Sequence, residues 1–341
     1  MKILVIRFSS LGDVVLTTAL FPNLRARWPE AEITVLTKPA YANVFDNNPS
    51  VDHVRLFDPT RQTFLQLATE IRGEGFDTII DLHGNMRSWV LRLLASAPVT
   101  VAVEKAAIAR RMLVYFKRRP RSLARSVRER ILDCLVPLEA PVVNQDTQLF
   151  PVVTPSLLLA HGIDPDKKLI GIAPGAMHNT KRWSPERFAE AANRLGAFPN
   201  AMVVIVGDKS DRAVAERVSK LISAPCKNLV GWTDLKELIA IVSQFSILLT
   251  NDSGVMHVAE ALKVPLVAIF GPTVRSFGFA PYRATSRVSE VINLGCRPCS
   301  LHGDDECPLK HHLCMEDVDV NAVLYAASPL LGQEGLPAEP V

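Results

Sequence analysis

Residues 247–261 read ILLTNDSGVMHVAEA. The apolar run Ile247–Thr250 predicts a buried strand, the small polar residues after it predict a turn, and the remainder favours a helix. A strand that passes through a glycine-containing turn into a helix is typical of parallel sheets, because helical crossovers join parallel strands. An α/β fold is therefore the first expectation.

Short apolar runs alternate with amphipathic stretches through most of the chain, which predicts a parallel sheet in each half. The other predicted strands are Ile3–Arg7, Ile33–Thr37, Val54–Phe57, Thr78–Leu82, Val99–Val103, Leu169–Ala173, Met202–Val206 and Leu266–Phe270. The predicted helices include Val14–Ala26, a helix beginning at Ser184-Pro185 with Ala191 and Leu195 on its apolar face, and Val318–Leu331 capped by Asp317.

The length of 341 residues predicts two domains, because it is about twice the usual domain size. Five prolines and weak periodicity indicate a linker within 137–165. We therefore expect one domain at 1–155, a second at 166–330 and a mobile tail at 331–341. Ligands of open parallel sheets bind outside the carboxyl ends of the strands, so the loops after the strands are the candidate sites.

Composition excludes several classes of protein. Hydrophobic residues make up 48% of the chain and charged residues 21%, an ordinary globular balance. No apolar run approaches the ~20 residues of a membrane span, and the opening residues are too short for a secretory signal. We expect a cytoplasmic protein, in which six cysteines are not a disulfide framework. Cys134 and Cys226 are expected to be small buried filler.

The net charge of +3 conceals a strongly basic segment. Lys105–Arg130 contains ten lysines and arginines and one glutamate, with apolar and aromatic residues among them. One interpretation is a solvated face. The other is a segment that lies on an anionic membrane surface or binds an anionic ligand. Nucleic acid is not an expected partner, because no recognised binding motif accompanies these residues.

The loop after the first predicted strand, FSSLGD, ends in Gly12 and Asp13. On local sequence alone, a cap of the following helix is a commoner role for Asp13 than a general base. Gly12 is the only glycine in the first seventy residues, so the G-x-G-x-x-G fingerprint of a dinucleotide oxidoreductase is absent. A Walker A loop is absent as well, which disfavours simple ATP hydrolysis.

Loops of the second half carry groups that suit phosphate oxygens. PGAMHNTKRW contains Thr180 and Lys181, a hydroxyl and a cation ahead of a helix. In TNDSGVMH, Ser253 and Gly254 place backbone N–H groups at a helix start, and His257 lies one turn later. Two further loops, GDKSD and FGPT, also follow strands. Incidental loop cations and a structural histidine are the alternative, but together the loops indicate a nucleoside-diphosphate ligand.

Three motifs, KILVIRFSSLGDVVLTTAL, PGAMHNTKRWSPERF and TNDSGVMHVAEALKVPLVAIFGPT, resemble those of glycosyltransferase family 9, the ADP-heptose:lipopolysaccharide heptosyltransferases. The resemblance runs from residue 1 to about residue 330 and is most similar to the heptosyltransferase II branch. It implies a GT-B architecture, in which two Rossmann-like domains with parallel sheets face each other across a cleft. The acceptor would bind the first domain and the sugar nucleotide the second.

The resemblance also implies roles for individual residues. Asp13 matches the catalytic carboxylate, which reverses the local preference for a cap. Ser10 and Gly12 match the acceptor side, and Thr180 and Lys181 match contacts to the donor diphosphate. The remaining matches on the donor side are Asp252, Ser253, Gly254 and His257, with Thr233 near the adenine-side loop.

The activity implied by the resemblance is inverting transfer of heptose from ADP-heptose to the inner core of lipopolysaccharide, with a carboxylate base and no required cofactor or catalytic metal. The expected location is the cytoplasm, in peripheral contact with the inner membrane, because the acceptor is an anionic lipid. Two alternatives stay open. One is another nucleotide-sugar transferase with a different cell-envelope acceptor, and the other is a nucleotide-binding module without catalysis.

One cysteine cluster departs from the donor-site pattern of this family. It consists of Cys296, Cys299, Cys307 and Cys314, with histidines between them. The spacing permits a structural zinc site of four thiolates, although only one close C-x-x-C pair is present. A loop that packs without metal is the alternative.

Overall fold

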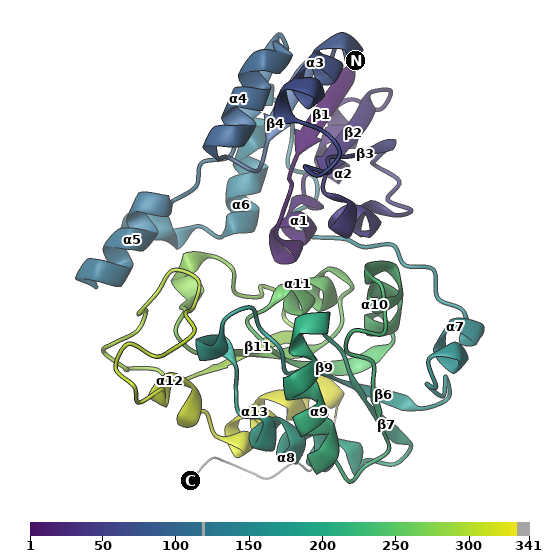
Figure 1. Ribbon diagram of the computed structural model, residues 1–341, viewed down its shortest axis with the longest axis vertical. Helices are drawn as coiled ribbons and strands as arrows, with labels where there is room; N and C mark the ends of the chain where they lie inside the picture. Colours follow the sequence, from purple (N-terminus) through teal and green to yellow (C-terminus); the bar gives the residue numbers. More distant parts are fainter. Residues whose placement is uncertain (118–119, 333–341) are drawn as a thin grey trace. The chain divides into compact units, whose positions relative to one another are not determined.

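The computed structural model describes residues 1–117 and 120–332, and its strands form two parallel sheets (Figure 1). The chain divides into two compact units. The first comprises Met1–Ala106 and Arg125–Phe150, and the second comprises Ala107–Ala124 and Pro151–Val341. The α/β class with two parallel sheets is therefore confirmed. Within the described residues, no helix has the length and apolar character needed to cross a membrane.

The sheet of the first unit has the order β3-β2-β1-β4-β5. Its strands are β1 (Lys2–Ile6), β2 (Glu32–Thr37), β3 (His53–Leu56), β4 (Thr78–Asp81) and β5 (Val99–Ala102). All five predicted strands are present, and each end differs from its predicted position by at most one residue. The central strand β1 is fully buried from Ile3 to Ile6, as its unbroken apolar run requires.

The helices of the first unit are short. They are α1 (Leu11–Thr17), α2 (Phe21–Arg27), α3 (Phe64–Glu74), α4 (Met86–Ala95) and α6 (Val127–Leu132), with 3₁₀ turns at η1 (Pro39–Phe45) and η3 (Asp133–Leu138). The single predicted helix Val14–Ala26 is wrong, because the chain breaks between α1 and α2. Pro22 lies in the first turn of α2 and has no N–H with which to continue a helix from α1.

The sheet of the second unit has the order β11-β10-β9-β6-β7-β8. Its strands are β6 (Lys168–Ala173), β7 (Ala201–Ile205), β8 (Cys226–Asn228), β9 (Phe245–Asn251), β10 (Leu266–Phe270) and β11 (Ser286–Glu290). The four strands predicted for this half are present. The edge strands β8 and β11 were not predicted, because an edge strand is only half-covered and their sequences, CKN and SRVSE, contain no apolar run.

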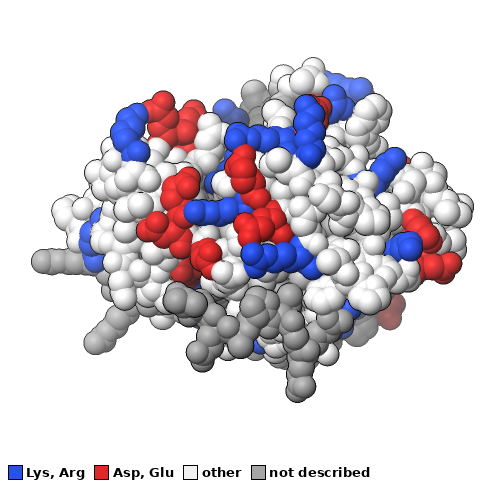
Figure 2. Space-filling view, turned by 90° about the horizontal axis from the view of Figure 1, so that it is seen from below, with Lys and Arg blue, Asp and Glu red and all other residues white. Residues whose placement is uncertain are grey.

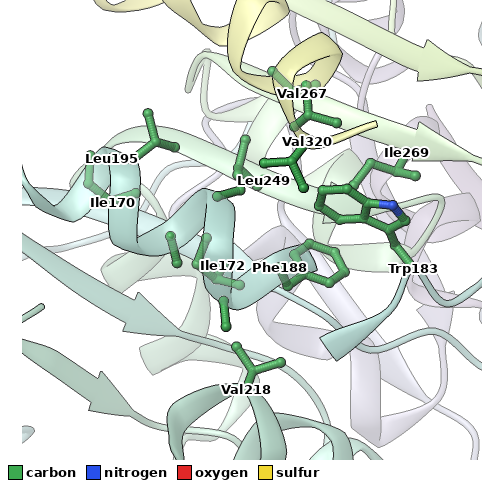
Figure 3. Packing of buried hydrophobic residues seen from close by; sticks show 14 of the residues in the cluster. Ile170, Ile172, Trp183, Phe188, Leu195, Val218, Leu249, Val267, Ile269 and Val320 are labelled. Carbon is green, nitrogen blue, oxygen red and sulfur yellow. The ribbon is translucent and has the colours of Figure 1, made fainter. Parts of the chain in front are cut away.

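Helices cover both faces of this second sheet (Figure 1). On one face lie α8 (Pro185–Gly196), α9 (Arg212–Leu221) and α13 (Val320–Ala327), and on the other lie α10 (Leu235–Val242) and α11 (Gly254–Ala261). Figure 3 shows the core beneath α8, where the rings of Trp183 and Phe188 meet edge to face at 5.1 Å and neither is exposed. As predicted, Ser184 caps α8 by accepting a hydrogen bond from the N–H of Arg187.

The end of the chain differs from the predicted helix Val318–Leu331. The chain forms α12 (Leu313–Glu316), then α13, and finally a 3₁₀ turn at η7 (Ser328–Leu331). The cap of α13 is Asp319, whose carboxylate accepts from the N–H of Asn321, and Asp317 instead ends α12. Residues 333–341, most of the predicted tail, lie outside the described residues.

The basic segment also departs from the expected division at 1–155, because part of it packs with the second unit. Helix α5 (Ala107–Phe116) and the turn η2 (Arg121–Ala124) belong there by their contacts. The predicted linker 137–165 contains the boundary between Phe150 and Pro151 and one short helix, α7 (Pro155–Ala160).

Replacing Gly171 by alanine tests the close packing of β6 on β9. An added Cβ would lie 2.2 Å from the ring of Phe245, so the core must shift at a cost of about 1–3 kcal/mol. We expect Gly171→Ala to lower the melting temperature. The control Gly73→Ala, near the end of α3, meets nothing within 4 Å and should keep or raise it. A wild-type melting temperature for Gly171→Ala would contradict this packing.

Candidate functional site

The residues singled out from the sequence lie at equivalent places in the two sheets. The strand order reverses beside β1 and β4 in the first unit, and beside β6 and β9 in the second. At such a point, the loops leaving two neighbouring strands diverge and open a crevice at the carboxyl end of the sheet. Asp13 follows β1, Lys181 follows β6, and Asp252 follows β9. Each unit therefore presents its candidate residues where parallel sheets bind ligands.

In the first unit, Asp13 pairs with Arg7. One Nη of Arg7 lies 2.7 Å from Oδ1 of Asp13, and the Arg7 side chain is nearly buried. The same guanidinium donates to the backbone carbonyls of Ser9 and Leu82, so it joins the loops after β1 and β4. The Asp13 side chain keeps 21% of its surface exposed. A positioned carboxylate thus remains accessible to a ligand.

Asp13 is also a helix cap, as the local sequence suggested. Ser10 is the N-cap of α1, and Oδ2 of Asp13 accepts from its hydroxyl at 2.9 Å and from its backbone N–H at 3.4 Å. Gly12 is buried in the first turn of the same helix. The capping role and the ion pair with Arg7 use different oxygens, so they coexist in one side chain.

His83, in the loop after β4, was not singled out from the sequence. Asp81 shapes this loop, because its Oδ1 accepts from the backbone N–H groups of His83 and Gly84. Burial, together with the positive charges of Arg7 and Lys105, lowers the pKa of His83 to about 4. The ring is therefore neutral at physiological pH. A glycine three residues after the end of β4, in DLHGN, was the available signal, and it matches the pattern of the loops that were selected.

In the second unit, Lys181 and Asp252 form a largely buried ion pair. Nζ of Lys181 lies 2.6 Å from Oδ2 of Asp252, and the hydroxyl of Thr273 donates to the same oxygen at 2.8 Å. Loops that follow β6, β9 and β10 therefore meet at one carboxylate. An ammonium has three N–H donors and Asp252 engages one of them, so Lys181 keeps hydrogen-bonding capacity for an anion.

Thr180 lies beside this pair, but its hydroxyl is engaged within the protein. It donates to the carbonyl of Asp304 and accepts from the N–H of Asp304, both at 2.8 Å. A ring nitrogen of His312 lies 2.8 Å from the carbonyl oxygen of Thr180. A loop more than 120 residues later therefore holds Thr180, and the role of its hydroxyl on a diphosphate stays a prediction.

The start of α11 provides the predicted backbone donors. Ser253 is the N-cap and Gly254 the first helical residue, so the N–H groups of this first turn have no partner within the helix. His257 is buried, and its ring lies 6.4 Å from that of Phe279. Thr233 lies half-exposed just before α10. Its predicted role at the adenine side stays a prediction.

The clustered cysteines lie close enough together that neighbouring thiols raise the pKa of Cys299 and of Cys314. Burial, together with the neighbouring thiols, raises the pKa of Cys314 to about 12. Burial opposes ionisation of the Cys307 thiol. Hydrogen bonds from the backbone N–H groups of Leu309–His312 outweigh that effect, so the pKa of Cys307 is lowered. Within residues 1–117 and 120–332, no group of three or more His, Cys, Asp or Glu side chains is arranged to hold a metal ion. The zinc site permitted by the spacing stays a prediction, which metal analysis of purified protein would test.

The other two cysteines differ in burial. Cys134 is buried in η3, and burial raises the pKa of its thiol to about 12. Cys226 is half-buried in β8, and burial raises its pKa as well. All six cysteines are free. The expectation of small buried filler is thus met fully by Cys134 and in part by Cys226.

Comparison with known proteins places these features in a family. The model of glycosyltransferase family 9 (heptosyltransferase) matches residues 64–310. The chain is 26% identical to lipopolysaccharide heptosyltransferase 2 of Salmonella typhimurium, over 98% of this chain and 100% of the relative. It is 32% identical to lipooligosaccharide heptosyltransferase 2 of Campylobacter jejuni, where the match covers 51% of this chain and 53% of the relative.

The fold is similar to that of a solved Escherichia coli structure, ADP-heptose LPS heptosyltransferase II. The TM-score is 0.78 at 25% identity, covering 97% of this chain and 98% of the other. This similarity confirms the GT-B class that the sequence motifs implied. The family model spans well over half of the residues and includes both the Lys181 and the Asp252 loops. This chain therefore belongs to glycosyltransferase family 9, the heptosyltransferase family.

Proposed function

We propose that this protein transfers heptose from ADP-heptose to the inner core of lipopolysaccharide, with inversion at the anomeric carbon and Asp13 as general base. The acceptor is the first core heptose, as in the heptosyltransferase II branch that the motifs resemble. The observation that carries the proposal is the partly exposed Asp13 carboxylate, which Arg7 holds at the carboxyl end of the first sheet in a member of this family. The family match and the names of the relatives support the choice of sugar.

The donor side of the reaction requires positive charge more than a proton. A sugar diphosphate departs with growing negative charge, which preorganised cations and N–H donors stabilise. Lys181 is fixed by Asp252 at 2.6 Å, and the first turn of α11 supplies backbone N–H groups that have no partner within the helix. In this proposal these groups bind the diphosphate of ADP, and no cofactor takes part. Thr180 holds the Lys181 loop in place through Asp304.

The acceptor side requires a base. In a single displacement with inversion, the acceptor hydroxyl attacks the anomeric carbon opposite the departing ADP and loses its proton during the attack. A carboxylate can receive that proton, and Asp13 is positioned by Arg7 on one oxygen and Ser10 on the other. Ser10 and Gly12 shape the same turn, which gives them a place beside the acceptor.

The reaction is tested by supplying nucleotide sugars and truncated lipopolysaccharides in a panel and following the released nucleoside diphosphate. We expect ADP to appear only when ADP-heptose and an acceptor are both present. Release of a different nucleoside diphosphate would favour the alternative transferase. So would release of ADP with a different cell-envelope acceptor but not with lipopolysaccharide. Tight binding of ADP-heptose with no release on any acceptor would favour a binding module without catalysis.

Asp13→Asn separates the base from the cap. An amide can still accept hydrogen bonds from Ser10, so α1 keeps its cap, but it cannot take a proton from the acceptor. Loss of a general base costs roughly 10²–10⁴-fold in rate. We expect transfer to fall by that factor, measured as ADP release, while ADP-heptose affinity measured by calorimetry is retained. Full activity in this variant would leave Asp13 with the capping role alone.

Lys181→Ala should weaken both donor affinity and turnover, because the ammonium contacts the diphosphate before the reaction and more strongly as charge develops. Isothermal titration with ADP and steady-state rates measure the two effects. Lys236→Ala, on an exposed position of α10, is the matched control and should change neither. Circular dichroism of Lys181→Ala checks that the fold survives. An unchanged ADP affinity in a folded Lys181→Ala protein would remove Lys181 from the donor site.

A further inference from the structure

Helix α5 exposes a continuous apolar face. Ile108, Met112, Tyr115 and Phe116 are all exposed, with 76% of Ile108 and 75% of Tyr115 accessible to solvent. Their spacing of four, three and one residues puts them on one side of a helix. A single exposed apolar side chain is ordinary, but several on one helical face mark a contact surface.

The opposite side of α5 is anchored in the second unit. Leu113 and Val114 are buried there. The guanidinium of Arg110 lies 5.0 Å from the centre of the Phe279 ring, and Nζ of Lys117 donates to the carbonyls of Cys296 and Pro298. The helix is thus held by one face, and its outward apolar face is a defined surface rather than a frayed end.

Helix α4 in the first unit has a similar face. Met86, Trp89 and Leu93 are exposed at a spacing of three and four residues, and 81% of Met86 is accessible. Its N-cap, Asn85, follows directly after the loop that carries His83. An exposed apolar surface of the first unit therefore begins three residues after His83, in the loop that Arg7 joins to the Asp13 loop.

The sequence that contains α5 is strongly basic. The segment Lys105–Arg130 holds ten basic residues and one acidic residue. Arg111 is exposed on α5 next to the apolar face, and Lys105 is exposed just before the helix. Arg118 and Arg119 lie outside the described residues. In contrast, basic and acidic side chains lie side by side on the face of the molecule drawn in Figure 2.

We propose that the outward face of α5 docks on the anionic surface of a lipid bilayer. Apolar side chains flanked by lysine and arginine are the composition of interfacial helices, and tryptophan and tyrosine favour the boundary between lipid and water. A second copy of this chain is a poorer occupant, because it would bring a second +9 segment to the same surface. Docking itself does not depend on the proposed function. Only its purpose, to bring the enzyme to a lipid-anchored acceptor, rests on that function.

Sedimentation with vesicles tests the docking face. We expect the full-length protein to bind vesicles that contain phosphatidylglycerol, to bind phosphatidylcholine vesicles far more weakly, and to dissociate as salt rises. The double variant Ile108→Ser/Tyr115→Ser should bind the anionic vesicles roughly tenfold or more weakly, because it removes two large apolar groups from the interface.

The matched control is Val152→Ser/Leu159→Ser, which removes two side chains that are each 61% exposed but lie away from α4 and α5 in the sequence. It should bind like the wild type. Wild-type vesicle binding by the α5 variant, an equal loss in the control, or equal binding to uncharged vesicles would overturn the proposal. So would a wild-type dimer in solution that the α5 variant converts to monomer, because that result assigns the face to a second copy.

A water-soluble, delipidated acceptor separates this proposal from the proposed function. With it, the α5 variant should release ADP from ADP-heptose at the wild-type rate. If the wild type releases no ADP with any acceptor, the proposed function fails while the vesicle result still stands. If ADP release is normal but the α5 variant binds vesicles like the wild type, only the docking surface fails.

Discussion

The buried carboxylate of Asp252 is the contact on which the arrangement of the second unit's loops depends. It accepts from Lys181 and from Thr273, so the segments that follow β6, β9 and β10 are held by a single side chain. Removing one partner of a buried ion pair typically costs about 3–5 kcal/mol, because the other charge is left in a poor solvent. The three loops therefore adopt their positions together. A ligand that enters meets a cation whose location is already determined.

In the first unit, a cation takes the place that the Asp252 carboxylate has in the second unit. There the nearly buried group is the guanidinium of Arg7, and it holds Asp13 together with backbone carbonyls from the loops after β1 and β4. Both clusters lie where the strand order of their sheet reverses. The geometry of a parallel sheet opens a crevice at that point, and an ion pair between loops gives the crevice a defined shape. The first unit holds a partly exposed carboxylate and the second a largely buried ammonium, which are the charges that the proposed reaction requires of its base and of its diphosphate contact.

Much of the fold could be predicted because buried parallel strands have a simple signature. A strand covered on both faces, such as β1 or β10, is an unbroken apolar run, which is easily recognised in a sequence. The signature disappears at the sheet edges, where β8 and β11 are half-exposed and polar, and both were missed. Val14, Leu20 and Leu24 of the predicted helix Val14–Ala26 are buried, but hydrophobic periodicity does not register the missing N–H of Pro22. The packing of α5 with the second unit depends on contacts such as that of Lys117 with Cys296, which are 179 residues apart.

For the candidate site as well, local sequence predicted the loops but not the distant residues that contact them. A glycine or polar turn after a strand located the loops of Asp13, Lys181 and Asp252, and the same local signal was present but unused at His83. What local sequence cannot provide is the partner of each group. Thr180 was assigned to a phosphate from its neighbours in the chain, yet its hydroxyl is committed to the backbone of Asp304, in the loop that carries the clustered cysteines. That loop therefore supports the loop of Thr180 and Lys181, although its cysteine spacing suggested a separate zinc site. Because Thr180 immediately precedes Lys181, a shift of Asp304 displaces the cation on which the proposed chemistry depends.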